Sequence, residues 1–273
     1  MIKEKLNLDG RVAIVTGGSR GLGREMALAL SAAGADVCIA SRTEKELAAT
    51  AAFIADKTGR APLTVPTDVR DSKQMDAMVA ATVAKFGKLD IMINNAGIGD
   101  RRGAGSHVWD LEDGDWADGI EVNLYSAFYG SRAAVQRFRA QKSPGVIINV
   151  ASGFGLRASP NSLSYGAAKA GVVNLTQSVA SQVAGEEIRV NCIVPGFLVQ
   201  APPETDDQKA MIAQRGRFNT ARRLGEAWEM GPLALFLASD LSSYITGEIF
   251  VIDGGGLAGG IAPIGQGLVE VAS

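Results

Sequence analysis

A glycine-rich loop between an apolar run and a helical pattern constrains the fold of this chain more than any other feature. The apolar run Val12–Val15 is short enough for a buried parallel strand. It leads into Thr-Gly-Gly-Ser-Arg-Gly-Leu-Gly at 16–23, and helical spacing of apolar residues then continues to Gly34. Glycines let the backbone approach a pyrophosphate closely, and a helix N-terminus offers free N–H groups to an anion. The sequence therefore predicts a dinucleotide phosphate site, although its Gly-x-x-x-Gly-x-Gly spacing differs from the common Gly-x-Gly-x-x-Gly.

Short apolar runs alternate with helical stretches along the chain, which favours a parallel sheet with helices on both faces. We predict an α/β fold, a single Rossmann-like, doubly wound domain of about seven strands over residues 1–255, with a glycine-rich C-terminal extension at 256–273. The predicted helices are Gly21–Ala33, Thr43–Lys57, Ser72–Phe86, Asp115–Gln141, Ser164–Ala184 and Glu226–Ser239. The predicted strands include Val12–Val15, Asp36–Ala40, Leu89–Ile93, Val146–Val150, Ile188–Val194 and Glu248–Ile252. Residues that follow such strands gather at the edge where ligands bind.

Composition and charge argue against several other kinds of protein. A formal net charge of −2 over 273 residues gives no electrostatic case for binding nucleic acid or an anionic membrane. No apolar run approaches the roughly 20 residues that span a bilayer, and the N-terminus lacks the apolar core of a signal peptide, so we expect a cytoplasmic protein. Cys38 and Cys192 fall in predicted strands as buried free thiols, and His107 is the only histidine. We therefore expect no metal site.

Tyr165 and Lys169 are the first candidates for proton chemistry. They lie four residues apart in Ser-Tyr-Gly-Ala-Ala-Lys and so share one face of a predicted helix. An adjacent ammonium favours the phenolate, so the pKa of Tyr165 is expected to fall from its reference value of about 10. The phenol can then act as a general acid or base. Ser152 follows the strand Val146–Val150, where a hydroxyl can point at a substrate, although Tyr-x-x-x-Lys alone also occurs in solvated helical turns.

The residues after the second predicted strand bear on the choice between NAD and NADP. An acidic side chain there would bond the adenosine ribose of NAD, but the chain has Ser41 and Arg42. The forked guanidinium of Arg42 suits a 2′-phosphate, and Arg20 in the glycine loop can close on the same phosphate. We therefore expect NADP (NADPH) rather than NAD. The alternative is a pair of solvated arginines.

Together these motifs resemble the short-chain dehydrogenase/reductase family, from about Leu8 to Gly255. The resemblance rests on the glycine loop, Asp68-Val69, Asn94–Gly97, Asn123, the set Ser152, Tyr165 and Lys169, Pro195-Gly196 and Asp253–Gly255. It implies four catalytic residues: Asn123, Ser152, Tyr165 and Lys169. It implies that the cofactor is held by Gly17, Ser19, Arg20, Gly21, Leu22, Gly23, Ser41, Arg42, Asp68, Val69, Asn95, Ala96, Gly97, Tyr165, Lys169, Pro195, Gly196 and Leu198.

The resemblance also implies a role for each catalytic residue. Tyr165 would protonate the developing alkoxide, and Lys169 would lower the pKa of Tyr165 and bond the nicotinamide ribose. Ser152 would hold the substrate oxygen, and Asn123 would keep a water in a relay that reaches Lys169. Hydride would pass between the nicotinamide and the carbon that bears this oxygen. The predicted function is an oxidoreductase that transfers hydride between NADP(H) and a secondary alcohol or ketone.

Two alternatives to this function stay open. The same machinery serves a 3-oxoacyl thioester (acyl-carrier-protein) reductase, which would want a basic docking patch near the mouth of the site. Possible members are Arg101, Arg102, Arg217, Arg222 and Arg223. A non-catalytic NADP-sensing protein could also keep the fold, but the intact catalytic set argues against it, because a sensor needs no proton relay.

Two segments are expected to surround the substrate. By resemblance, residues 198–222 form a mobile lid. The loop 98–113 carries Arg101, Arg102, His107 and Trp109, which would favour an anionic or polar substrate or would simply be solvated. The family often has a threonine shortly after Pro195-Gly196; its absence leaves the nicotinamide carboxamide to Gln200 or a backbone group. By analogy, the helices at 115–141 and 164–184 would form a homotetramer or homodimer.

Overall fold

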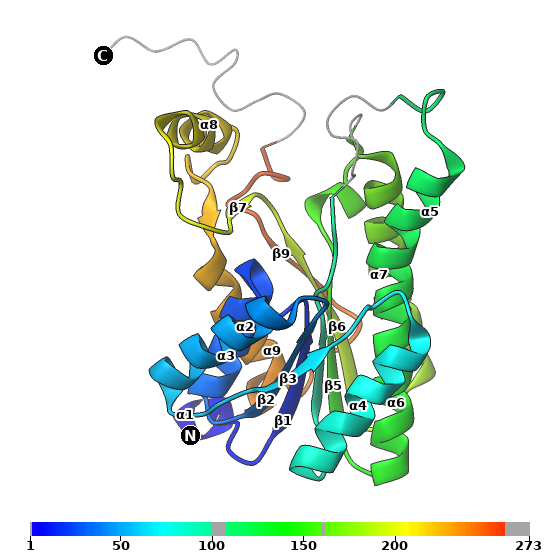
Figure 1. Cartoon of the computed structure of the whole chain (residues 1–273). Helices are drawn as coiled ribbons and strands as arrows, with labels where there is room; N and C mark the ends of the chain where they lie inside the picture. Colours follow the sequence, from blue (N-terminus) through cyan, green and yellow to red (C-terminus); the bar gives the residue numbers. More distant parts are fainter. Residues whose placement is uncertain (1, 100–106, 160–161, 260–273) are drawn as a thin grey trace.

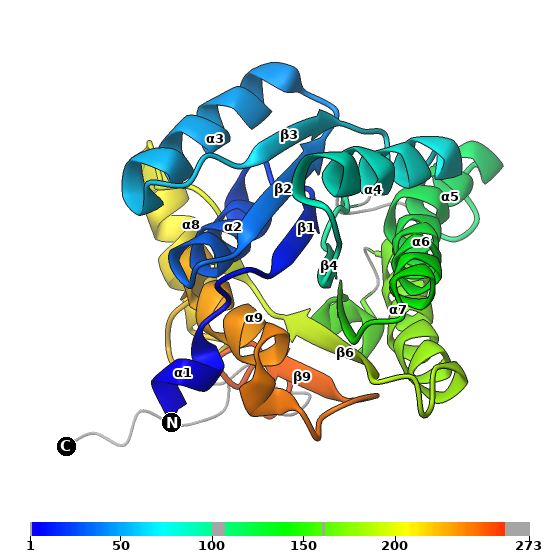
Figure 2. The same ribbon diagram turned by 90° about the horizontal axis from the view of Figure 1, so that it is seen from below.

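Seven parallel strands form the central sheet in the computed structural model, which describes residues 2–99, 107–159 and 162–259. Their order is β3-β2-β1-β4-β5-β6-β9, so the chain reverses its direction of winding between β1 and β4 (Figures 1 and 2). The strands are β1 Val12–Thr16, β2 Asp36–Ser41, β3 Leu63–Pro66, β4 Ile91–Asn94, β5 Gly145–Val150, β6 Ile188–Pro195 and β9 Ile249–Ile252. This doubly wound topology confirms the predicted fold class.

Helices cover both faces of the sheet, as Figure 2 shows from below. On one face α2 packs against α3 and α9, and on the other α4 packs against α6, and α5 against α7. The helices are α1 Ile2–Leu6, α2 Gly21–Ala32, α3 Glu44–Thr58, α4 Ser72–Phe86, α5 Asp113–Ile120, α6 Ser126–Gln141, α7 Leu163–Gln182, α8 Asp206–Gly216 and α9 Met230–Ala238. None of the helices in this described part of the chain is long and apolar enough to cross a membrane.

Burial on both faces explains why the central strands read as continuous apolar runs. Every residue of β1 and of β5 is buried. Val15 and Leu30 belong to the core cluster on the side of α2 and α9, whereas Ile14 and Phe138 belong to the cluster on the side of α4 and α6. Adjacent residues of β1 thus serve opposite layers, as the period of a strand requires.

The long helix predicted at Asp115–Gln141 is wrong in one respect, because it is interrupted. Helix α5 ends at Ile120, a π-helical turn spans Glu121–Tyr125, and α6 begins at Ser126. Asn123 lies within this turn and its side-chain amide donates to the carbonyl oxygens of Gly119, at 3.0 Å, and Ile98, at 2.9 Å. π-turns of this kind are frequent at functional sites, and hydropathy does not reveal them.

The predicted lid region contains structure that the sequence analysis did not assign. Helix α8 lies within it and begins with a capping box, in which Thr205 and Gln208 bond each other's backbone N–H groups. Two short strands, β7 Leu198–Val199 and β8 Gly225–Glu226, pair with each other at its ends. Helices α5 and α8 rise beyond the same end of the sheet (Figure 1). Only residues 256–259 of the predicted C-terminal extension are among those described.

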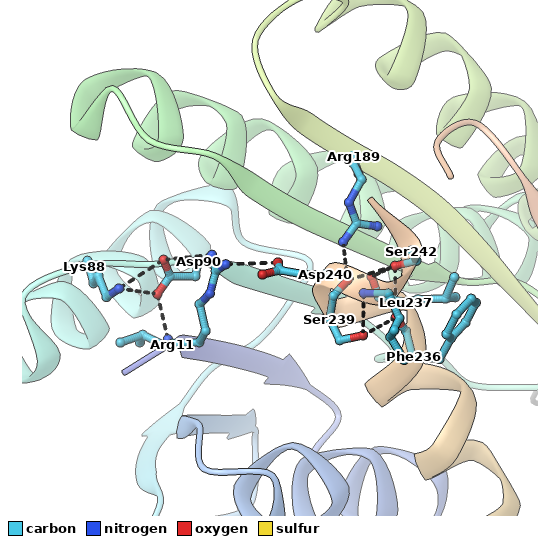
Figure 3. Close-up of polar contacts among 11 residues, drawn as sticks. Arg11, Lys88, Asp90, Arg189, Phe236, Leu237, Ser239, Asp240 and Ser242 are labelled. Carbon is cyan, nitrogen blue, oxygen red and sulfur yellow. Dashed lines mark hydrogen bonds and ion pairs between the residues drawn. The ribbon is translucent and has the colours of Figure 1, made fainter. Parts of the chain in front are cut away.

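The opposite end of the sheet is closed by the polar network in Figure 3. Asp90, which is buried, accepts a hydrogen bond of 2.8 Å from the backbone N–H of Val12 and lies 3.1 Å from the Lys88 ammonium. Arg11 pairs with Asp240 at 3.2 Å, and Arg189 donates to the carbonyl of Ser239 at 3.1 Å. These contacts tie β1, β4 and β6 to the end of α9 and leave the carboxyl edge for ligands.

Candidate active site

A cavity of about 330 Å³ lies at the carboxyl edge, where β1, β2, β4, β5 and β6 end. Fifteen of the predicted cofactor residues line it: Gly17, Ser19, Arg20, Leu22, Gly23, Ser41, Arg42, Asp68, Val69, Asn95, Ala96, Gly97, Tyr165, Lys169 and Pro195. Gly196 and Leu198 line a second, adjoining cavity, which is described below, and Gly21 lines neither cavity. The topology thus brings together segments that are far apart in sequence.

The glycine loop is fastened to the end of β4. The side-chain amide of Asn95 donates to the carbonyl oxygens of Thr16, at 3.0 Å, and Gly17, at 3.3 Å. Gly17 has a positive φ of 65°, and a Cβ there would lie 2.9 Å from the Ala96 backbone. A Cβ on Gly23 would overlap the Gly17 carbonyl. The spacing of these glycines is therefore what lets the loop, the first turn of α2 and the end of β4 pack closely.

The adenosine end of the cavity holds an unpartnered hydroxyl. The buried Oγ of Ser41 makes no hydrogen bond to any described residue. Arg42 beside it is exposed, and Arg20 lies 3.7 Å from Glu46, whose carboxylate also accepts from Ser19 Oγ at 3.1 Å. A buried hydroxyl without a partner and two exposed guanidinium groups on one rim fit an anionic nucleotide.

Asp68 is held in place by a neighbour that the sequence analysis missed. Arg70 lies 2.6 Å from its carboxylate, and this hydrogen bond holds the pKa of Asp68 below its usual value. Arg70 and Thr67 also line the cavity, together with Thr43, Glu46, Ile98, Gly99, Val122, Val150, Ala151 and Gln200. Most of these residues follow strand ends, which is the only signal that could have identified them.

Lys169 lies behind Tyr165 in the wall of the cavity. Its ammonium is buried, donates a 2.9 Å hydrogen bond to the carbonyl of Val150 and lies 5.7 Å from the centre of the Tyr165 ring. Burial lowers the pKa of Lys169 to about 8. The ammonium therefore remains largely protonated at neutral pH, and its buried charge lies close to the phenol ring.

Asn123 is close to Lys169 but is occupied by structural contacts. Both hydrogens of its side-chain amide go to backbone carbonyls, and its oxygen accepts from the N–H of Ile98 at 3.1 Å. A Cβ on Gly97 would lie 2.7 Å from this oxygen and 3.3 Å from Lys169 Nζ, so the two polar groups flank Gly97. The Asn123 amide thus fixes the segment after β4, and its oxygen faces the side on which the ammonium lies.

Ser152 and Tyr165 line a second cavity of about 760 Å³. The two cavities share Gly99, Tyr165, Pro195 and Gln200, so the phenol stands where they meet. Ser152 Oγ accepts a 3.3 Å hydrogen bond from the N–H of Phe154, which holds the hydroxyl at the start of a short 3₁₀ turn. The walls are largely aromatic and aliphatic, with Phe154, Phe197, Leu198, Phe218 and Leu257.

The segments expected to surround the substrate differ in what they contribute. The lid places Phe218 and Arg215 in the second cavity. In the loop 98–113, Arg101 and Arg102 lie outside the described residues, and His107 and Trp109 stack on each other at 4.4 Å without lining either cavity. A Cβ on Gly21 would lie 2.6 Å from Gln200 Oε1, so Gln200 stands directly over the glycine loop.

The residues that would serve metal or thiol chemistry are elsewhere. Among the described residues, no cluster of His, Cys, Asp and Glu side chains could hold a metal ion. Cys38 and Cys192 are buried and unpaired, as predicted, and burial raises the pKa of each thiol to about 11. Both thiols are therefore protonated at neutral pH and poorly reactive.

A dinucleotide fold in which Tyr165 lies between a cavity lined by Lys169 and a cavity lined by Ser152 is typical of a nicotinamide-dependent oxidoreductase. Comparison with known proteins makes this assignment more specific. A family model described as enoyl-(acyl carrier protein) reductase matches residues 17–256. This chain belongs to the short-chain dehydrogenase/reductase family, whose members transfer hydride with NAD(P).

Three relatives illustrate the range of that family. The chain is 36% identical, over 90% of its length and 92% of the relative, to (5R,7aS)-5-hydroxy-7a-methyl-1-oxo-2,3,5,6,7,7a-hexahydro-1H-indene-carboxyl-CoA reductase of Mycobacterium tuberculosis. It is 37% identical, over 91% and 98%, to 3-oxoacyl-[acyl-carrier-protein] reductase FabG of Haemophilus influenzae. The structure of NADPH-dependent 3-quinuclidinone reductase from Rhodotorula rubra aligns with a TM-score of 0.84 at 29% identity, covering 94% of this chain and 95% of that one.

Proposed function

We propose that this protein is an NADP(H)-dependent reductase of ketones, and in reverse a dehydrogenase of secondary alcohols, with Tyr165 as its acid and base. One observation carries the proposal: Tyr165 lines both cavities, with the Lys169 ammonium behind it. A cofactor in the smaller cavity and a carbonyl compound in the larger one would meet at this phenol. Ser152, which lines the larger cavity, supplies a second hydroxyl for the substrate oxygen.

The residues of the chain would manage the proton and the oxygen. When bound, the nicotinamide supplies or accepts the hydride at the carbon that bears the oxygen. Ser152 donates a hydrogen bond to this oxygen, and Tyr165 gives it a proton as negative charge develops. The charge of Lys169 stabilises the phenolate that remains. Asn123 positions the backbone of 97–98 beside Lys169 and thereby shapes the path by which the proton is replaced.

Preference for NADP is supported by the rim of the smaller cavity. Arg42 and Arg20 line it and are exposed, and a 2′-phosphate would accept hydrogen bonds from both guanidinium groups. Glu46 neutralises part of this charge but also holds Arg20 near the rim, at 3.7 Å. The structural relative from Rhodotorula rubra is NADPH-dependent.

A 3-oxoacyl thioester reductase is the second candidate, favoured by the likeness to FabG. The basic docking patch gains little support, because one of its expected members, Arg223, forms an ion pair with Glu229 at 2.7 Å. Retention of the complete catalytic set argues against the sensor alternative.

The wider setting of the enzyme is also part of the proposal. We expect a cytoplasmic protein that acts on a small molecule. Exposed aromatic side chains on α6 and just before it, Tyr125 and Phe128, support association of copies through this helix into a homotetramer or homodimer. Light scattering after size-exclusion chromatography would measure the mass of the assembly.

The deciding experiment measures NADPH and NADH consumption with ketones, diketones, sugar-derived ketones and acetoacetyl thioesters, with Tyr165→Phe as the control. Turnover of ketones that requires Tyr165 would support the first candidate, and turnover limited to the thioesters would support the second. Tight NADPH binding without turnover of any compound would favour the sensor.

A further inference from the structure

We propose that the larger cavity selects ketones with an apolar, ring-containing body and an anionic group remote from the carbonyl, with Arg215 as the principal anion-binding residue. The proposal rests on the proposed function, because Tyr165 and Ser152 fix the carbonyl end. The anionic group is a carboxylate or a phosphate, both of which match the guanidinium fork.

A continuous series of contacts leads from the catalytic phenol to this guanidinium. The ring of Phe154 meets that of Tyr165 edge-on at 6.4 Å, and the ring of Phe197 meets that of Phe154 edge-on at 5.8 Å. The guanidinium of Arg215 then lies over Phe197, 5.6 Å from the ring centre. These residues come from four segments: α7, the turn after β5, the turn after β6 and the end of α8. A substrate that follows this wall has its oxygen at one end and the cation at the other.

The dimensions and lining of the cavity suit a body of more than one ring. Its volume of about 760 Å³ lies in the upper part of the range for small-molecule sites, and a small ketone would leave most of it to water. Phe218 and Leu257 add further apolar surface to the lining. Aromatic edges and faces pack well against flat or cyclic carbon skeletons.

The charge that lines the cavity is predominantly positive. Arg157 and Arg215 both line it and are exposed, and no ion pair to a described carboxylate engages either of them. Asp253 is the one acidic residue among the described lining residues, and its two oxygens already accept from the N–H groups of Gly255, at 2.8 Å, and Leu257, at 2.7 Å. Arg223, just beyond the lid, is by contrast paired with Glu229. Among the described cations of the lid, Arg215 is thus the one that lines this cavity, and it is available to a ligand there.

The test compares a ketone acid with its neutral counterpart. The acid is 4-(4-oxocyclohexyl)benzoate, the neutral compound is its methyl ester, and 4-(4-oxocyclohexyl)phenyl phosphate separates phosphate from carboxylate. Arg215→Met keeps an apolar chain over Phe197 while it removes the charge. Lys209→Met is the matched control, since Lys209 is an exposed cation on α8 that lines neither cavity and pairs with Asp206.

We expect the native enzyme to favour an anionic compound over the ester by about tenfold or more in kcat/KM. Arg215→Met should abolish this preference by raising the KM of the anion, with the ester changed less than twofold and Lys209→Met without effect. Arg157→Met should give a smaller loss in the same direction. Equal rates for anion and ester in the native enzyme, or equal losses for both in Arg215→Met, would overturn the proposal.

Equilibrium binding separates this inference from the proposed function. Calorimetry with Tyr165→Phe saturated with NADPH measures the affinity for each compound without turnover. If the native enzyme reduces no ketone, the proposed function fails, but a tenfold loss of anion affinity on adding Arg215→Met would still support the anion site. If ketones are reduced but the affinity for them depends neither on their charge nor on Arg215, only the anion site fails.

Discussion

The buried Lys169 ammonium lies 5.7 Å from the centre of the Tyr165 ring, and the pKa of Lys169 is lowered to about 8 by burial. The charge that we propose to assist Tyr165 is therefore held at the expense of stability. The ammonium is close enough to act electrostatically on the phenol, and its own burial limits the screening of its charge.

Lys169→Met should make the protein more stable and inactive. The depressed pKa destabilises the folded state by about 3 kcal/mol below pH 8, and loss of the hydrogen bond to Val150 offsets about 1 kcal/mol of the gain. We expect a rise of about 2 kcal/mol in the free energy of unfolding at pH 7, measured by urea denaturation.

The pH dependence of that difference has a defined sign. Because the unfolded state binds the proton more tightly, the native protein gains stability as the pH rises from about 8 to 10.5, whereas the variant does not. The advantage of Lys169→Met should therefore shrink over this range. A constant difference between pH 7 and 10 would contradict the assignment.

Tyr165→Phe tests the proton transfer directly. The substitution removes one hydroxyl and preserves the ring contact with Phe154. We expect turnover to fall by at least 10³-fold, within the range that general acid–base catalysis supplies, with NADPH affinity changed less than threefold. Stopped-flow hydride transfer and fluorescence titration give the two values. Substantial residual turnover would mean that another group donates the proton.

The choice of cofactor can be reversed at the rim of the smaller cavity. Arg42→Asp places a carboxylate where a 2′-phosphate is expected, so the KM for NADPH should rise by about 100-fold or more while that for NADH changes little. Steady-state kinetics with both cofactors are required. Equal changes for NADPH and NADH would show that Arg42 does not read the phosphate.

The sequence was sufficient to predict site residues that backbone geometry requires or that directly follow a strand. The glycine loop, Asn95 and Ser152 all follow apolar runs, and the parallel topology places them on one edge. It did not reveal the π-helical turn at 121–125, because the apolar pattern of α5 and α6 runs through it without a break. Nor did it reveal Arg70 or Arg215, since an arginine in a polar segment has the same local pattern whether it is solvated or lines a cavity.

Gly97→Ala should impair catalysis through a single methyl group. A Cβ at this position would lie 2.7 Å from Asn123 Oδ1 and 3.3 Å from Lys169 Nζ, so both polar groups would have to move. We expect kcat to fall by about tenfold or more, because small displacements of catalytic groups are costly. Gly99→Ala is the matched control, since its Cβ would meet no described atom within 4 Å. Similar losses of kcat in both variants would show that any methyl group in this loop impairs catalysis, and not specifically one placed between Asn123 and Lys169.

The closed end of the sheet should matter for stability alone. The buried Asp90 carboxylate accepts from the Val12 N–H and pairs with the Lys88 ammonium. Asp90→Asn removes the negative charge and replaces one accepting oxygen with an NH2 group, which has no acceptor among these two donors. We expect a loss of about 2 kcal/mol in the free energy of unfolding, with NADPH affinity unchanged. Asp240→Asn is the control at the same end. The Asp240 carboxylate is 65% exposed and pairs with Arg11, so this variant should lose less than about 0.5 kcal/mol in the free energy of unfolding. Urea denaturation of the three proteins gives these values. A larger loss in Asp240→Asn than in Asp90→Asn would mean that the outer pair, not the buried carboxylate, closes this end of the sheet.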